Sequence, residues 1–182
     1  MMTLTRDNGL RRVWRRFWHD RSGSASVEFA IVLPLVLTLL IMGAEAGYTA
    51  LQRISLERAV DIAVRDVRLG NLPSGTTHQE FRAHVCDRAM MLAACEERLL
   101  IEMRVIQTSN FALPAGNAPC IDLAEPITPA TPFTVGSGEN VMYLRACYLM
   151  RPIFPTTSFG LQLPLDDSGM FALRTVTGFV NE

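Results

Sequence analysis

The sequence predicts an α+β protein in which a long N-terminal membrane helix continues into an exported domain with a second helix and a small antiparallel sheet of about three strands. Three observations support this fold class. An uncharged apolar run covers residues 29–44, a charged helical pattern follows it directly, and three strand-like runs lie in the second half of the chain. We therefore expect a leader at 1–23, a transmembrane helix at 24–51 and an exported domain at 52–182.

Charge is distributed unevenly along the chain. Residues 1–23 hold six arginines against two aspartates, a net charge of +4, whereas residues 24–182 carry eleven arginines against sixteen carboxylates. A basic segment directly before an apolar helix follows the positive-inside rule, so we expect a cytoplasmic leader and a periplasmic C-terminal domain. The acidic remainder offers no basic surface, and no nucleic-acid partner is expected.

The apolar run is long enough to cross a bilayer once its helix is extended. Residues 29–44 are sixteen positions without a charge, and extension to Leu51 gives twenty-three with one carboxylate, where a crossing needs about 20. A secretory signal peptide is the alternative, because small residues at 43–47 imitate a cleavage site. The long basic leader and the helical pattern beyond the run favour a spanning helix.

The helical pattern continues past the membrane segment. Apolar residues between 48 and 69 recur at helical spacing, with charged residues on the other side. One helix over about 26–69 would be roughly 65 Å long, and it would end at the glycine, asparagine and proline of 70–73. Pro34 lies inside the span, where the loss of a backbone donor predicts a kink that membrane helices tolerate.

The exported domain begins with a short helix and continues with strands. Residues 77–92 predict the second helix, with Thr76 or Thr77 at its N-cap. The strand-like runs cover 99–108, 141–150 and 170–180, and the first alternates apolar with polar side chains. A proline-rich stretch separates the first two runs, and we interpret it as a surface loop tied down by Cys120.

Four cysteines follow the membrane helix on the exported side: Cys86, Cys95, Cys120 and Cys147. An oxidising periplasm predicts two disulfides, for which three pairings exist. Nine residues on an unbroken helix point two side chains to opposite sides, so a Cys86–Cys95 bond requires the helix to end near Leu92. We favour Cys86 with Cys95 and Cys120 with Cys147.

Neither a metal site nor an enzyme is expected. The cysteines lack the CxxC spacing of zinc sites, and His78 and His84 are six residues apart, so they do not share a helix face. The sequence contains no G-x-S-x-G, no HExxH and no glycine-rich phosphate loop. We therefore expect no catalytic residue and no cofactor.

The most informative motif lies where the leader meets the apolar helix. Gly23 is followed five residues later by Glu28 and then by Phe29 and the apolar run, as in a substrate of a prepilin peptidase. Glycine at the cut lets the chain adopt an extended shape in a tight cleft. With Gly23 as the last leader residue, Ser24 becomes the first mature residue and Glu28 the fifth.

The run SGSASVEFAIVLPLVL at residues 22–37 resembles the TadE-like family of minor pilins or pseudopilins, which belong to tight-adherence (Flp-type) pilus systems. The basic leader, the small residues, VEFA, Pro34 and Glu45 carry the likeness, which is close over about 45 residues. Looser likeness extends to residues 81–86, to 144–152 and to the C-terminal pair at 181–182.

The resemblance implies an assembly role in such a pilus or a related secretion machine. The expected partners are a prepilin peptidase that cuts after Gly23, other pilins or pseudopilins, and the inner membrane, with incorporation in an extracellular pilus as an option. The alternative is an uncleaved, membrane-anchored periplasmic binding or sensor protein.

Two glutamates of the helix have open roles at this point. Glu28 either pairs with the amine of a neighbouring subunit or lies among the headgroups without a partner, and the resemblance favours pairing. Glu45 either contacts a partner inside a helix bundle or lies at the outer interface in water. Because it is near the end of the span, we expect the position in water.

Overall fold

The computed structural model describes residues 14–15, 24–73, 75–109, 120, 133–135, 138 and 140–180. Gly23, most of the leader and the C-terminal pair at 181–182 therefore lie outside the described residues. The chain forms two compact units, residues 1–43 and 44–182. Residues 44–51, which the sequence analysis assigned to the membrane segment, share the second unit with the sheet.

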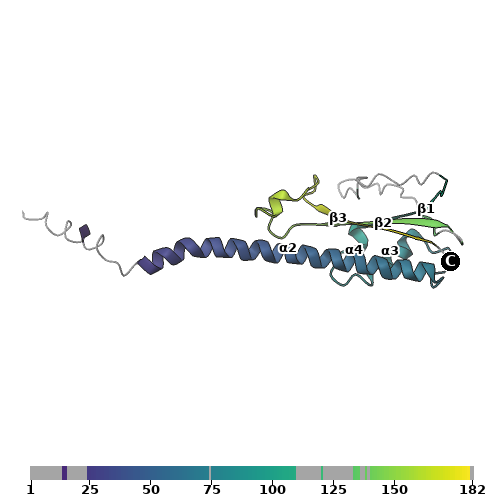
Figure 1. Cartoon of the computed structure of the whole chain (residues 1–182), viewed down its shortest axis with the longest axis horizontal. Helices are drawn as coiled ribbons and strands as arrows, with labels where there is room; N and C mark the ends of the chain where they lie inside the picture. The colour runs from purple at the N-terminus through teal and green to yellow at the C-terminus, as the bar shows by residue number, and fades with distance from the viewer. Residues whose placement is uncertain are drawn as a thin grey trace, which may run out of the picture. The chain divides into compact units, whose positions relative to one another are not determined.

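Helix α2 (Ser24–Arg68) is the longest element and contains 45 residues (Figure 1). It agrees within two residues with the predicted helix at 26–69. Gly70 ends it with a positive φ of 67°, and its N–H donates to the Val67 carbonyl at 3.1 Å. The helix continues on both sides of Pro34, so this proline does not end the helix.

The second helix is shorter than expected. Helix α3 (His78–Cys86) begins with a capping box, in which Thr77 and Glu80 satisfy each other's backbone N–H groups. The hydrogen bond from the Thr77 backbone N–H lowers the pKa of Glu80 below its usual value. The prediction of a helix to residue 92 is wrong, because turns follow Cys86 and Ala94 takes the left-handed conformation with φ of 49°.

A short helix and three strands complete the second unit. Helix α4 (Cys95–Arg98) leads directly into β1 (Leu99–Ile106), and β2 (Val141–Met150) and β3 (Phe171–Val180) follow. They form an antiparallel sheet in the order β1-β2-β3. This confirms the predicted α+β fold with a long N-terminal helix, a second helix and a three-stranded antiparallel sheet.

The main core lies between the sheet and the second half of α2. Figure 1 shows the strands alongside this part of α2, with α3 and α4 next to it. Each large apolar side chain that is removed from water here contributes about 1.5–3 kcal/mol. The core includes Leu56, Val60, Ala63 and Val67 of α2, Phe81 and Val85 of α3, and Ile101, Met103, Met142, Leu144 and Tyr148 of the sheet.

The sheet is also buried on its second face, which the sequence pattern did not reveal. Glu102 and Arg145 are directly paired across β1 and β2 and are each 5% exposed. Arg145 Nη2 lies 3.1 Å from Glu102 Oε2, and Arg104 also contacts that carboxylate. Because buried charges are stable only when they are paired, the alternation of β1 reflects an internal ion pair.

Candidate functional site

The first candidate site is the apolar surface of α2. Its most apolar stretch has no buried residue within the structure, and Ile31 and Leu35 are 71% and 63% exposed. Exposure of a continuous apolar helix surface to water is unfavourable, so we expect a membrane or other apolar helices to cover it. By length and composition α2 can cross a membrane, and it is the one such helix among the described residues.

Glu28 lies close to the helix start and is exposed, as is Phe29. The first turn of α2 contains no acidic residue, because Ser24 begins the helix and Glu28 is its fifth residue. The helix dipole acts mainly within the first turn, so it contributes little to the environment of Glu28. Residues 24 and 28 are one helical turn apart and share a face of α2.

Glu45 lies in a different environment from the one expected. The predicted position in water is wrong, because Glu45 is only 2% exposed. Its Oε1 accepts a hydrogen bond from the Phe154 backbone N–H and its Oε2 accepts one from Thr157 Oγ1, both at 3.0 Å. The segment after β2 folds over the helix at this point and supplies both donors.

All four cysteines are in disulfides. Cys86 is bonded to Cys95 and Cys120 to Cys147, with Cα–Cα distances of 5.6 and 5.9 Å. This is the pairing that the sequence analysis favoured. The end of α3 at Cys86 allows the chain to turn back, while Cys120 is attached to the central strand β2. The rest of the predicted loop around Cys120 lies largely outside the described residues.

A polar cluster that the sequence analysis missed joins α2 to α3. Asp66 Oδ2 lies 2.9 Å from His84 Nε2 and 3.3 Å from Arg88 Nη2. His84 Nδ1 lies 3.1 Å from Arg88 Nη1, so the ring donates through Nε2 and accepts through Nδ1. The hydrogen bond from His84 is the main cause that lowers the pKa of Asp66 below its ordinary 3.8.

The other histidine also has a structural role. His78 Nε2 is 2.9 Å from the Ile101 carbonyl, and its ring packs edge-on against Phe133 at a centroid distance of 5.4 Å. These contacts attach α3 to β1. Among the described ranges, no group of three or more histidine, cysteine, aspartate or glutamate side chains is arranged to hold a metal ion.

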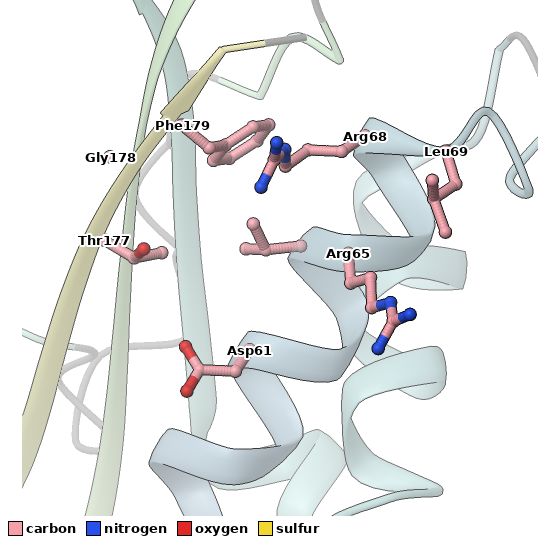
Figure 2. Close-up of a pocket in the computed structure, with 8 residues that line it drawn as sticks. Asp61, Arg65, Arg68, Leu69, Thr177, Gly178 and Phe179 are labelled. Atoms are coloured by element: carbon pink, nitrogen blue, oxygen red, sulfur yellow. The ribbon is translucent and has the colours of Figure 1, made fainter. Parts of the chain in front are cut away.

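A pocket of about 370 Å³ opens between the last turns of α2 and β3. Figure 2 shows Asp61 and Arg68 pointing toward the space beside β3, whereas Arg65 points away from it. Thr177 and Phe179 form the strand side of the pocket. The lining is a mixture of opposite charges and apolar groups and contains no paired nucleophile and base of the kind that enzymes use.

Comparison with known proteins finds a family match for the segment that contains the apolar surface, Glu28 and Glu45. Residues 23–65 match the model of the family described as TadE-like protein, in agreement with the resemblance found in the sequence. This family is associated with the assembly of Tad pili and is not known as an enzyme family. The match covers α2 up to its last turn. No curated protein and no solved structure matches the chain.

Proposed function

From the match of residues 23–65 to the TadE-like family, we propose that this chain is a minor pilin or pseudopilin in the assembly of a tight-adherence pilus or related secretion machine. The exposed apolar surface of α2 supports the proposal most directly. A pilin subunit needs such a surface twice, first in the lipid and then against the helices of its neighbours. No catalytic step is required for this role.

We further propose that the chain is anchored in the inner membrane with its leader in the cytoplasm. The net charge of +4 on residues 1–23 supports this orientation, because cytoplasmic flanks of membrane helices are enriched in arginine and lysine. The disulfides Cys86–Cys95 and Cys120–Cys147 are consistent with it, since such bonds persist in an oxidising compartment.

Cleavage after Gly23 by a prepilin peptidase is the third part of the proposal. It would free the amine of Ser24, the first residue of α2. A neighbouring subunit could then present its own amine to the exposed Glu28 carboxylate, which attracts a cation in a low-dielectric setting far more strongly than in water. Glu28 would act as an assembly contact and not as a determinant of cleavage.

The experiment expresses the full chain with and without the cognate prepilin peptidase and determines its N-terminal sequence. We expect a chain that begins at Ser24 only when the peptidase is present, and Gly23→Ala should block this change. Retention of Met1 or Met2 in both strains would contradict cleavage and would favour the membrane-anchored binding or sensor protein.

A second pair of variants separates assembly from cleavage. Glu28→Ala should still be cut but should co-purify less with the other pilins. Glu57→Ala is the matched control, because it removes a partly exposed carboxylate of the same helix at a position that is paired with Arg53. Equal losses in the two variants would show that Glu28 has no special role.

A further inference from the structure

The connection between β2 and β3 carries an uncharged, apolar surface. We call residues 152–165 the β2–β3 loop; the sequence contains no charged side chain between Arg151 and Asp166. Large apolar side chains normally cluster on a surface where another phase or molecule covers them. The exposed ones are Ile153 at 52%, Phe154 at 40%, Leu161 at 73% and Leu165 at 42%.

Hydrogen bonds fix the shape of this loop. Thr157 Oγ1 accepts a hydrogen bond from the Gly160 N–H at 3.1 Å, and its single hydroxyl proton lies between Glu45 Oε2 and the Phe154 carbonyl, at 3.0 and 2.9 Å from Oγ1. A Cβ added at Gly160 would lie 2.5 Å from the Phe154 carbonyl oxygen, so the backbone at Gly160 packs closely against the backbone at Phe154. The apolar side chains are therefore presented by a defined backbone.

The loop also has few backbone N–H groups that would lose hydration in an apolar environment. Prolines at 152, 155 and 164 have no N–H. The Phe154 N–H donates to Glu45, and the Thr157 and Leu161 N–H groups donate to backbone carbonyls within the loop. Because unsatisfied backbone groups are costly in lipid, this pattern suits contact with a membrane surface.

Glu45 determines where along α2 the loop is attached. Both carboxylate oxygens of Glu45 accept hydrogen bonds from the loop, at Phe154 and Thr157. A bilayer crossing takes about 20 residues, and the uncharged apolar run of α2 covers residues 29–44. The attachment point is thus the first residue after this run, near the outer end of the span.

We propose that the β2–β3 loop lies on the outer surface of the bilayer that α2 crosses and inserts its apolar side chains between the lipid headgroups. This inference rests on the proposed membrane anchorage. Glu45 acts as a positioning residue that holds the loop at the membrane level, while Arg151 and Asp166 remain in water on either side. Lipid is the partner, because at this level it surrounds the anchored helix on all sides.

The experiment measures tryptophan quenching by brominated lipids in vesicles of phosphatidylethanolamine and phosphatidylglycerol that contain the full chain. Trp14 and Trp18 are first replaced by phenylalanine, and one tryptophan is introduced per variant. Leu161→Trp reports on the loop and Leu35→Trp on the apolar helix. Val180→Trp is the control, because Val180 is a half-exposed apolar residue at the far end of β3. We expect several-fold quenching at 161 and 35 and little at 180.

Each outcome has a separate meaning. If the tryptophan at 35 is quenched but the tryptophan at 161 is quenched no more than the one at 180, the loop inference is overturned and the anchorage stays intact. A lack of quenching at 35 would overturn the anchorage and the loop inference together. Adding Glu45→Ala to the Leu161→Trp variant should reduce the quenching of the tryptophan at 161. Adding Glu45→Ala to the Leu35→Trp variant should leave the quenching of the tryptophan at 35 unchanged. Intact disulfides, checked by thiol labelling, show that each variant has folded.

Discussion

The carboxylate of Glu45 accepts a hydrogen bond from the backbone N–H of Phe154, 109 residues further along the chain, at 3.0 Å. The second oxygen accepts from Thr157 Oγ1. Glu45 is almost fully buried, so water does not replace a lost donor. The second half of α2 and the β2–β3 loop are therefore energetically coupled through one side chain.

This coupling can be measured with a double-mutant cycle. Glu45→Gln and Thr157→Val should each lower the free energy of unfolding by about 1–3 kcal/mol, because each leaves a buried polar group unsatisfied. The double variant should lose less than the sum of the two, as expected for residues in direct contact. Denaturant unfolding in detergent gives these values. Glu28→Gln, at an exposed position, should change nothing, and strict additivity would contradict the coupling.

Asp66→Asn should make the free energy of unfolding depend less on pH in the acid range. The pKa of Asp66 is lowered in the folded chain, chiefly by the hydrogen bond from His84. The unfolded chain therefore binds a proton at higher pH, and the stabilisation is complete above the ordinary value of 3.8 and is lost as the pH falls through the lower folded value. Wild type and variant should differ at neutral pH and converge in acid. The exposed Asp87→Asn removes the same charge and should show no such convergence.

The two disulfides should contribute unequally to stability. The Cys120–Cys147 bond joins residues 27 apart, whereas the Cys86–Cys95 bond joins residues 9 apart. Loop-closure entropy predicts that the longer bond stabilises by about 1 kcal/mol more. The alanine pair at 120 and 147 should thus unfold at lower denaturant than the pair at 86 and 95. The opposite order would show that native packing around the cysteines outweighs chain entropy.

The buried ion pair of the sheet predicts an asymmetric result. Glu102→Ala should lower the free energy of unfolding by about 3–5 kcal/mol, since the buried Arg145 guanidinium would lose its contact with the Glu102 carboxylate. The double variant Glu102→Val with Arg145→Met should be more stable than Glu102→Ala, because both charges are then absent. Thermal unfolding of the oxidised chain measures the difference. A double variant less stable than the single one would show that the pair itself stabilises the sheet.

Local sequence patterns predicted most of the fold. The uncharged run and the spacing of apolar residues placed α2, and the strand-like runs placed β1, β2 and β3 to within two residues. These features depend on neighbours along the chain. The end of α3 at Cys86 was missed because apolar residues continue at helical spacing to Leu92, and the left-handed Ala94 leaves no trace in residue type.

The candidate sites were predicted less completely, because several depend on long-range contacts. The burial of Glu45 arises from a loop that follows β2, and the Glu102–Arg145 pair arises from the register of two strands far apart in the sequence. The Asp66–His84 contact joins two helices. A single sequence contains the residue types of these contacts but not their distances.

The position of β3 at the edge of the sheet has a consequence for incomplete chains. β3 pairs along its whole length with β2 and supplies Phe171, Leu173 and Phe179 to the core. A chain cut short before Phe171 would keep α2 but would expose the backbone of β2 as an open edge beside uncovered apolar side chains. Open edges of this kind recruit other strands and aggregate. Premature termination would thus yield an aggregation-prone target for proteolysis instead of a smaller folded protein.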